Sequence, residues 1–316
     1  MATVLFTAPY MIPQLDRFRE VFERFNLELI VPQVQERMEE SQLLAYAGQF
    51  DGTICGDDRY TARVLQACAP PLKVISKWGT GIDSIDADAA ARLGIQVYRT
   101  PNAFTIPVAD SVLGYILSFA RRLPWMDRAV KSGTWEKIPG RTLSECTLGV
   151  VGVGNCGKAV LRRARAFGME LLGTDIVEIA PDFIREQRVE MTSLDELLKR
   201  SDFVSLNCDL NPTSVRLIDA HRLAQMKPGA VLINLARGQV VDENALVNAL
   251  QQGIIAGAAL DVYESEPLPG DSPLIQMDNV MLAPHNANSS PFAWNRVHWN
   301  TIRNLFTGLG LPAGEL

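Results

Sequence analysis

Histidine is scarce in this chain, and its few cysteines are not spaced as pairs. The 316 residues include three histidines and five cysteines. No two cysteines form a C-x-x-C motif, so the sequence favours neither a zinc site nor a disulfide framework. Two of the histidines, His221 and His298, fall within helical patterns, where we expect structural roles. We therefore predict reduced thiols and no metal centre.

A strong excess of one charge and a long apolar run are also missing. The chain has 30 Lys and Arg against 36 Asp and Glu, a net charge of −6, and its basic residues are scattered. This excludes the basic patch that nucleic-acid binding requires. No run approaches the length of a membrane span, and the first residues lack the basic region of a signal peptide. We expect a cytoplasmic protein with neither nucleic acid nor membrane as a partner.

What the chain does contain is a regular alternation of short β-rich runs and helical patterns. The β-rich runs are TVLFTAP, LELIVP, DGTICG, LKVISKWG and IQVYRT in the first hundred residues, then TLGVVGVG, ELLGTD, DFVSLNC, AVLINLA and IAGAALDVY. This alternation predicts an α/β fold with two doubly wound parallel-sheet domains. A boundary is expected near residue 100, followed by a helix over about 106–122. The apolar spacing of AWNRVHWNTIRNLF predicts a last helix that packs back on one domain.

A glycine-punctuated loop follows one of these runs. Gly152, Gly154 and Gly157 form G-x-G-x-x-G between an apolar run and a helical pattern, which is the context of the dinucleotide fingerprint. Their missing side chains permit a tight turn, close approach of a pyrophosphate and helix packing on the strand. An ordinary turn is the alternative for the glycines alone. Asp175 ends the next run, where an acid bonds both ribose hydroxyls and repels a 2′-phosphate, so the motif favours NAD over NADP.

Polar residues suited to hydride transfer on a hydroxy acid follow three later runs. A guanidinium at Arg237 can grip a carboxylate, and an imidazole at His285 can exchange a proton near neutral pH. Asp261 and Glu266 follow the run IAGAAL. Taken singly, each residue has a plainer interpretation as a surface ion pair, a loop hydrogen-bonder or a buried histidine. Jointly they favour a site, because ligands of open parallel sheets bind at the carboxyl ends of strands.

Four longer motifs add to this pattern, namely SKWGTGIDSIDADAAARLGIQVYRTPNAFTIPVAD, INLARGQVVDENAL, GAALDVYESEP and APHNA. With them the chain resembles the D-isomer-specific 2-hydroxyacid dehydrogenase family over nearly its whole length. The resemblance implies a Rossmann NAD-binding domain, residues 102–285, inserted into a discontinuous flavodoxin-like substrate domain, residues 1–101 and 286–316. It also implies an NAD-dependent oxidoreductase acting on a D-2-hydroxy acid and 2-oxo acid pair. A homodimer with an exchanged arm near residues 122–145 is expected as well.

The resemblance further implies roles at matching positions. Arg237, Glu266 and His285 match the family's catalytic residues, and Asp261 matches the acid that bonds the nicotinamide carboxamide. The other positions expected to bind the cofactor are Val108, Gly152, Gly154, Asn155, Cys156, Gly157, Asp175, Ile176, Cys208 and Ala236.

Expectations about the substrate centre on the sequence KWGTG. Gly79 and Thr80 match the loop whose backbone amides meet the substrate carboxylate. Lys77 aligns with a basic residue of the phosphoglycerate dehydrogenase branch, so it is a candidate for binding a second anionic group. The alternative role for Lys77 is an ion pair with a surface acid. Trp78 is expected either to line the substrate site or to fill a gap between the domains. The candidate pairs are 3-phosphoglycerate with 3-phosphohydroxypyruvate, and the hydroxy acids of glyoxylate or hydroxypyruvate.

The chain departs from the family pattern at several positions. Asn207 and Asp209 replace the histidine and proline of H-x-P-L-T, Asp110 stands where glutamate is usual, and HNANSS replaces a glycine-rich sequence. The departures do not affect the three catalytic positions, Arg237, Glu266 and His285. They leave the identity of the substrate undetermined. Two alternatives to the dehydrogenase interpretation are an NAD(H)-sensing protein of the corepressor type, without turnover, and an enzyme that oxidises formate or phosphite.

Overall fold

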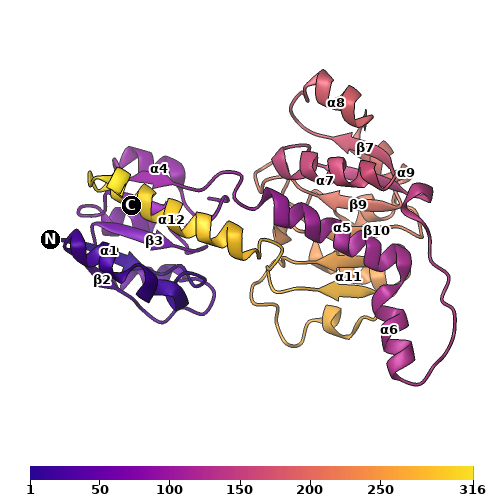
Figure 1. Ribbon diagram of the computed structural model, residues 1–316, viewed down its shortest axis with the longest axis horizontal. Coiled ribbons are helices and arrows are strands. Elements are labelled where there is room, and N and C mark those ends of the chain that lie inside the picture. Colours follow the sequence, from indigo (N-terminus) through magenta and orange to yellow (C-terminus); the bar gives the residue numbers. More distant parts are fainter. Residues whose placement is uncertain (316) are drawn as a thin grey trace. The chain divides into compact units, whose positions relative to one another are not determined.

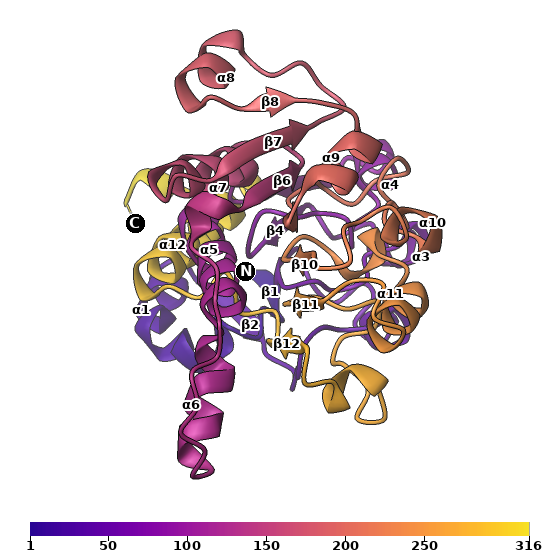
Figure 2. The same cartoon turned by 90° about the vertical axis from the view of Figure 1, so that its right-hand side faces the viewer.

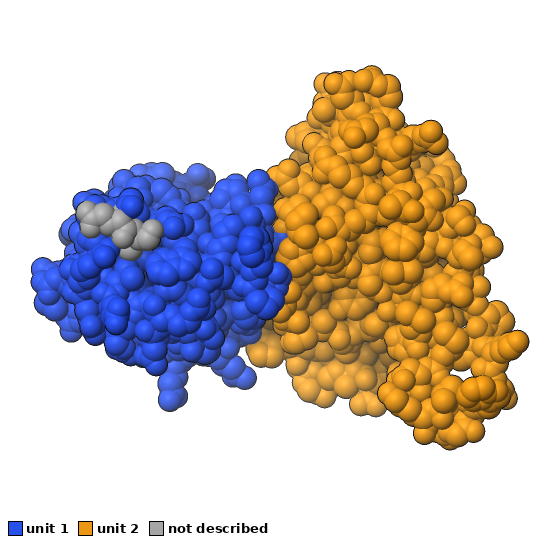
Figure 3. Space-filling view, viewed as in Figure 1, with its two compact units in different colours: residues 1–104, 290–316 blue, residues 105–289 orange. Residues whose placement is uncertain are grey.

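The structure is a computed structural model that describes residues 1–315 as two compact units. Unit 1 comprises Met1–Phe104 and the chain from Ser290 onward, and unit 2 comprises Thr105–Ser289 (Figure 3). Each unit is built on its own fully parallel sheet. This confirms the predicted fold class of two doubly wound α/β domains. No helix in the described part of the chain is long and apolar enough to cross a membrane.

The sheet of unit 1 has the strand order β2-β1-β3-β4-β5, which is the flavodoxin-like order. Its strands are β1 (Ala2–Phe6), β2 (Leu27–Ile30), β3 (Gly52–Cys55), β4 (Val74–Lys77) and β5 (Gln96–Tyr98). Its helices are η1 (Ile12–Arg17), α1 (Arg19–Arg24), α2 (Glu40–Leu44), α3 (Ala62–Cys68), α4 (Ala87–Arg92), α12 (Pro291–Gly308) and η5 (Ala313–Glu315).

The central strands β3 and β4 are buried on both faces and are mainly apolar, whereas the edge strands β2 and β5 carry the exposed Glu28 and Gln96. Side chains alternate between faces along a strand. In β1, Val4 and Phe6 therefore join the core beneath α1 and α12, whereas Leu5 joins the core on the opposite face. This arrangement explains the short continuous apolar runs in the sequence.

The last helix, α12, packs against β3, β4 and β5 of unit 1 (Figure 1). It begins after Ser290, whose side chain accepts a hydrogen bond from the amide of Ala293. A Cβ at Gly308 would lie 2.3 Å from Val74, and a Cβ at Gly52 would lie 2.8 Å from Leu305. The two glycines thus allow the helix to approach the sheet closely.

The sheet of unit 2 has the order β12-β11-β10-β9-β6-β7-β8. Its strands are β6 (Thr147–Val151), β7 (Glu170–Thr174), β8 (Glu190–Met191), β9 (Phe203–Leu206), β10 (Val231–Asn234), β11 (Gly257–Leu260) and β12 (Val280–Leu282). Strands β6 to β8 are added toward one edge of the sheet and β9 to β12 toward the other, so the strand order reverses between β6 and β9, as in the Rossmann fold. In such sheets the ligand-binding crevice forms at this reversal.

Helices cover both faces of this second sheet. Figure 2 shows α5 and α7 on one face and α9, α10 and α11 on the other. The helices of unit 2 are α5 (Thr105–Arg121), α6 (Leu123–Lys131), α7 (Asn155–Ala166), α8 (Pro181–Gln187), α9 (Leu194–Arg200), α10 (Ala220–Leu223) and α11 (Glu243–Gln251), with short 3-10 turns η2 (Leu143–Glu145), η3 (Gly238–Val240) and η4 (Pro273–Gln276).

The helix α6 is a feature that the sequence pattern did not predict. It follows Arg122, whose φ of 55° lies in the left-handed region and turns the chain out of α5. Leu123, Met126 and Val130 recur at helical spacing, but no residue of α6 is buried, so its apolar stripe does not face the core of unit 2.

Candidate active site

Four of the predicted site residues lie on loops that follow three neighbouring strands of unit 2. Arg237 follows β10, Asp261 and Glu266 follow β11, and His285 follows β12. The strands pair in parallel, with Asn234 opposite Leu260 and Leu260 opposite Leu282. Their carboxyl ends therefore lie at one edge of the sheet, which brings these loops together.

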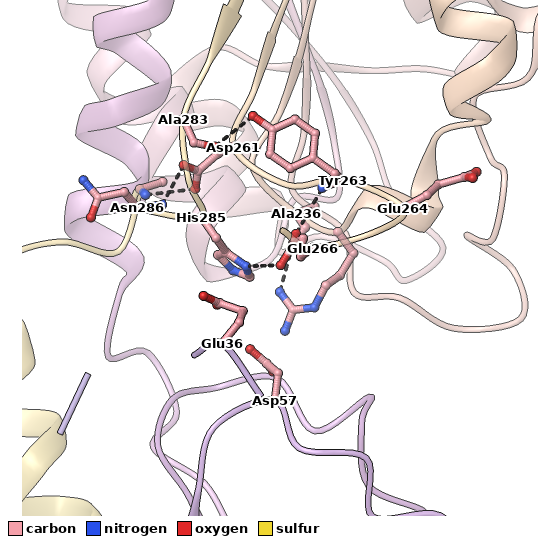
Figure 4. Close-up of polar contacts among 12 residues, drawn as sticks. Glu36, Asp57, Ala236, Asp261, Tyr263, Glu264, Glu266, Ala283, His285 and Asn286 are labelled. Carbon is pink, nitrogen blue, oxygen red and sulfur yellow. Dashed lines mark hydrogen bonds and ion pairs between the residues drawn. The ribbon is translucent and has the colours of Figure 1, made fainter. Parts of the chain in front are cut away.

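The imidazole of His285 and the carboxylate of Glu266 form a hydrogen-bonded pair. His285 Nδ1 lies 2.9 Å from Glu266 Oε2, with the two side chains 21% and 19% exposed (Figure 4). The other carboxylate oxygen, Oε1, accepts a hydrogen bond from the amide of Tyr263 at 3.0 Å. Both oxygens of Glu266 are thus engaged, and the carboxylate fixes the orientation of the ring. The contact with Glu266 is made through Nδ1 of the ring.

The backbone of His285 is in a strained conformation that Asp261 holds from two sides. His285 has a φ of 51°, in the left-handed region, and its amide donates to the carbonyl of Asp261 at 2.8 Å. The buried carboxylate of Asp261 accepts from the amides of Asn286 at 2.7 Å and Ala287 at 2.9 Å. Burial raises the pKa of Asp261, and these two amide hydrogen bonds oppose the rise. Asp261 therefore secures the loop that carries His285. The sequence did not predict this structural role of Asp261.

A buried asparagine and a glycine shape the loop of Arg237. Asn234 donates from Nδ2 to the carbonyl of Arg237 at 2.9 Å and accepts at Oδ1 from the amide of Ala236 at 3.1 Å. A Cβ at Gly238 would lie 1.9 Å from the carbonyl carbon and oxygen of Tyr263. Only glycine allows this approach, which explains why Gly238 follows Arg237 in the sequence.

Tyr263 joins the site's loops, although the sequence did not single it out. Its hydroxyl lies 3.1 Å from the carbonyl of Leu260 and 2.9 Å from that of Ala283. Burial raises the pKa of Tyr263 well above its usual range, so the hydroxyl keeps its proton. The side chain thus ties the end of β11 to the segment that leads to His285. The aromatic residue within DVYESEP was the available signal.

The glycine loop of unit 2 has the geometry that the dinucleotide fingerprint predicts. Gly152 has a φ of 89°, and a Cβ there would lie 2.7 Å from the amide nitrogen of Cys208. A Cβ at Gly157 would lie 2.0 Å from the carbonyl oxygen of Gly152. Gly154 is the N-cap of the twelve-residue helix α7, and a Cβ there would meet open space. Turn, close packing and an open helix N-terminus therefore occur together, so these residues fit a bound pyrophosphate.

Asp175 lies at the end of β7 and contacts the same loop. Its Oδ2 accepts a hydrogen bond from the amide of Val153 at 2.6 Å, and its Oδ1 accepts from that of Val177 at 3.1 Å. The adjacent Ile176 is 78% exposed. The carboxylate is therefore fixed beside the glycine loop, where a ribose would be bound.

Two of the predicted cofactor residues are cysteines. Cys156 lies in the first turn of α7 and Cys208 follows β9. Burial raises the pKa of both thiols, that of Cys208 to about 11. Both remain protonated at neutral pH. Of the other predicted cofactor residues, Val108 and Ala236 are partly buried and Asn155 is exposed.

The departures from the family pattern have partners within unit 2. Asn207 donates from Nδ2 to the carbonyl and hydroxyl oxygens of Ser205 at 3.1 and 3.0 Å. Asp110, on α5, pairs with Arg163 on α7 at 2.6 Å. These contacts support the strand end and the helix pair, so the structure gives both residues a local role.

The residues predicted on the substrate side lie in unit 1, where β4 ends. Lys77 is the last residue of β4, and its side chain is 5% exposed with Nζ 3.1 Å from Asp57 Oδ1. Trp78 is buried. Gly79 has a φ of 122°, and the Thr80 hydroxyl donates to the carbonyl of Thr100 at 2.8 Å.

Comparison with known sequences identifies the family. A sequence model of the D-isomer specific 2-hydroxyacid dehydrogenase, NAD binding domain, matches residues 113–287, more than half of the chain. The chain belongs to this family. It is 42% identical over 275 residues to a glyoxylate reductase of Thermofilum pendens, covering 85% of this chain and 81% of that protein. It is 36% identical over 281 residues to the human D-3-phosphoglycerate dehydrogenase, covering 88% of this chain and 52% of that protein.

Solved structures agree with this family assignment. The fold superposes on the crystal structure of a D-lactate dehydrogenase from Aquifex aeolicus complexed with NAD and lactic acid, with a TM-score of 0.88 and 29% identity. The match covers 98% of this dehydrogenase-family chain and 95% of the other. These relatives are reductases and dehydrogenases, which fits the enzyme interpretation and not the corepressor alternative.

Proposed function

We propose that this protein is an NAD-dependent oxidoreductase that interconverts a 2-oxo acid and a D-2-hydroxy acid. The observation that carries the proposal is the His285–Glu266 pair, at 2.9 Å, on the strand edge that also bears Arg237. It combines a group that exchanges a proton at neutral pH with a cation suited to a carboxylate. The family membership and the glycine loop support the choice of cofactor.

His285 is the proposed proton donor in the reducing direction. When bound, NADH supplies the hydride. His285 gives its Nε2 proton to the carbonyl oxygen of the substrate, and in the oxidising direction the same nitrogen takes it back. Glu266 stabilises the charged imidazolium by accepting from Nδ1, which keeps the ring in one orientation. Arg237 is proposed to hold the substrate carboxylate and to polarise the oxo group beside it.

Further contacts to the carboxylate are proposed for the loop after β4. The backbone amides of Gly79 and Thr80 are the donors that the family resemblance suggests. Backbone amides suit a carboxylate because each is a fixed donor that costs no reorganisation. Lys77 and Trp78 are included in this substrate-side group, and a more specific role for them is developed below.

The proposed cofactor contacts all come from unit 2. Gly152, Gly154 and Gly157 shape the turn, and the N-terminus of α7, with Asn155 and Cys156, faces the pyrophosphate. Asp175 accepts from the adenosine ribose and Ile176 covers the neighbouring adenine side. The remaining positions proposed to line the nicotinamide side are Val108, Cys208, Ala236 and Asp261.

The deciding experiment measures NADH oxidation across a panel of 2-oxo acids. Glyoxylate, hydroxypyruvate, pyruvate, a bulky 2-oxo acid and 3-phosphohydroxypyruvate cover the substrate classes suggested by the relatives. Turnover of one or more supports the proposal, and their kcat/KM ratios identify the class. If purified protein binds NADH but reduces none of them, the proposed activity is wrong.

We also propose that the protein is a homodimer in the cytoplasm. The helix α6 and the segment that follows it expose apolar side chains, Leu123 at 49%, Val130 at 51% and Trp135 at 88%. A second copy of the chain that covers this arm would remove them from water.

A further inference from the structure

Trp78 is held by its indole ring. Its Nε1 donates to His298 Nδ1 at 2.9 Å, and the two side chains are 4% and 2% exposed. His298 lies on α12, 220 residues further along the chain. The indole has one donor and no acceptor, so this bond satisfies it and fixes the ring. The rings of Tyr10, Phe104 and Trp294 pack around it at centroid distances of 5.3, 5.4 and 5.9 Å.

Trp78 is also held by its backbone. The Lys77 ammonium donates to the carbonyl of Trp78 at 3.1 Å and lies 3.1 Å from Asp57 Oδ1. The amide of Trp78 donates to the carbonyl of Cys55 at 2.9 Å. The side chain of Lys77 is 5% exposed, so the ammonium is shielded from water, whereas its partner Asp57 is 35% exposed. Every hydrogen-bonding group of Trp78 is thus engaged within unit 1.

The carbonyl of Trp78 and the amide N–H of Gly79 belong to the same peptide group. A peptide group is planar, and in the trans form its C=O and N–H point in opposite directions. A donor that fixes the carbonyl therefore also fixes the direction of the Gly79 N–H. The other side of Gly79 is fixed as well, because its carbonyl accepts from the amide of Thr100 at 2.7 Å.

We propose that Lys77 and His298 are positioning residues, which hold the Trp78–Gly79 peptide so that the Gly79 amide is directed at the substrate carboxylate. This inference rests on the proposed function, which assigns that amide to the carboxylate. Lys77 acts on the peptide directly, through the Trp78 carbonyl. His298 acts through its hydrogen bond to the indole. That bond prevents the side chain of Trp78 from rotating and displacing the peptide.

The geometry of Lys77 favours this role over direct binding of a phosphate group. Its charge is already matched by Asp57, and an approaching phosphate would have to compete with that carboxylate for a buried ammonium. Drawing the buried ammonium toward a phosphate would break its ion pair with Asp57, which is 35% exposed, and remove the donor from the carbonyl of Trp78. A pair that stays intact holds the peptide in the same way for every 2-oxo acid, phosphorylated or not.

His298 is suited to accept a hydrogen bond over the physiological pH range. Burial, followed by the charge of Arg17, lowers the pKa of His298 to about 4. The ring is therefore neutral near pH 7, and Nδ1 keeps the lone pair that accepts from Trp78.

The role of His298 is tested with four variants and one substrate that the wild type reduces. His298→Leu removes the acceptor, His298→Asn keeps one on the same side of the residue, Trp78→Phe removes the donor, and the double variant Trp78→Phe/His298→Leu removes both. Loss of the bond should raise the KM for the 2-oxo acid about tenfold, the effect of one hydrogen bond, and leave the KM for NADH unchanged. His298→Asn should restore most of the loss.

The double variant separates positioning from folding. His298→Leu and Trp78→Phe each leave one buried polar group without a partner, which lowers thermal stability, whereas the double variant leaves neither. Its melting temperature should recover toward the wild-type value while its KM for the 2-oxo acid stays high. If KM recovers together with the melting temperature, or never rises in any variant, the role of His298 as a positioning residue is wrong.

The role of Lys77 is tested with Lys77→Met on hydroxypyruvate and on 3-phosphohydroxypyruvate. A positioning role predicts that KM rises by the same factor for both, because both present a carboxylate to Gly79. Lys73→Met is the matched control, since Lys73 lies near the start of β4 with its side chain 63% exposed, beside Asp51 at 3.5 Å. A loss confined to the phosphorylated substrate would show that Lys77 binds phosphate and overturn the proposal.

Hydrogen exchange gives a readout that does not depend on turnover. Amides of residues 77–82 should exchange faster in His298→Leu and Lys77→Met than in the wild type, and His298→Asn should retain protection. Unchanged exchange in all variants would overturn the proposed bracing of the loop. Because a wild type without turnover tests the proposed function separately, the two failures are distinguishable.

Discussion

His285 Nδ1 and Glu266 Oε2 lie 2.9 Å apart, and the amide of Tyr263 holds the other oxygen of the same carboxylate. A carboxylate fixed in this way cannot turn away from the ring, so it holds the imidazole in one orientation. The pair joins two loops that leave neighbouring strands, β11 and β12.

Replacement of His285 by alanine should lower kcat by about 10²–10⁴-fold, the usual loss when a general acid is removed. NADH binding, followed by fluorescence titration, should persist because the glycine loop is untouched. A variant that keeps wild-type kcat would exclude His285 as the proton donor.

Replacement of Glu266 by glutamine should act through His285. The amide cannot balance an imidazolium charge as a carboxylate does, so the charged ring is less stable. In the rate profile for reduction, activity should therefore decline at a lower pH than in the wild type. The measurement is kcat/KM for the 2-oxo acid from pH 5 to pH 10, and an unchanged profile would assign Glu266 a purely structural role.

Asp175→Ala should weaken the preference for NADH over NADPH. The wild type should prefer NADH clearly, because the carboxylate repels a 2′-phosphate. Asp175 also accepts from the amide of Val153, so its loss loosens the glycine loop for both cofactors. The informative quantity is therefore the ratio of kcat/KM values for the two cofactors, with the exposed Asp182→Ala as a control. Equal use of both cofactors by the wild type would contradict this prediction.

Gly238→Ala should reduce both stability and activity. Its Cβ would meet the carbonyl of Tyr263 at 1.9 Å, so the loop of Arg237 must move. Forced overpacking of this kind costs about 1–3 kcal/mol or more in the free energy of unfolding. Gly229→Ala is the control, because a Cβ there meets open space. Urea unfolding and kcat/KM measured together should show both losses in the first variant and neither in the second.

Two buried groups of unit 1 should oppose each other in the pH dependence of stability. Burial lowers the pKa of His298 from 6.5 to about 4, so the unfolded chain binds more protons between these values and stability falls as pH falls. Burial raises the pKa of Asp58 from 3.8 to about 6, although Thr7 and Met38 donate hydrogen bonds to it. There the folded chain binds more protons, so that contribution to stability grows as pH falls.

Asp58→Asn should therefore steepen the loss of stability from pH 6.5 to pH 4, and His298→Asn should reduce it. Each change is on the order of 2 kcal/mol across that range. The measurement is the free energy of urea unfolding at several pH values. Parallel curves for both variants and the wild type would rule out a net contribution from these groups.

The sequence by itself determined the features that depend on local patterns. Short apolar runs in alternation with helical patterns predicted two parallel sheets, because a strand buried on both faces needs no polar alternation. The spacing of Gly152, Gly154 and Gly157 predicted a tight turn into a helix, because Gly152 needs a left-handed backbone, Gly157 has no room for a Cβ, and Gly154 is the N-cap of the helix. The order of Arg237, Glu266 and His285 along the chain predicted one edge of a sheet, because parallel strands end together.

Only the tertiary structure decided which partners these residues meet. Lys77 has an ammonium group that the sequence left free for a phosphate or an acid, and the pairing of β3 with β4 puts Asp57 beside it. Trp78 meets His298 because α12 returns to the sheet of unit 1 across 220 residues. The carboxylate of Asp261 meets the amides of Asn286 and Ala287 because β12 lies next to β11. Contacts of this kind depend on register and helix placement, which are set by packing over the whole core and leave no periodic signal in the chain.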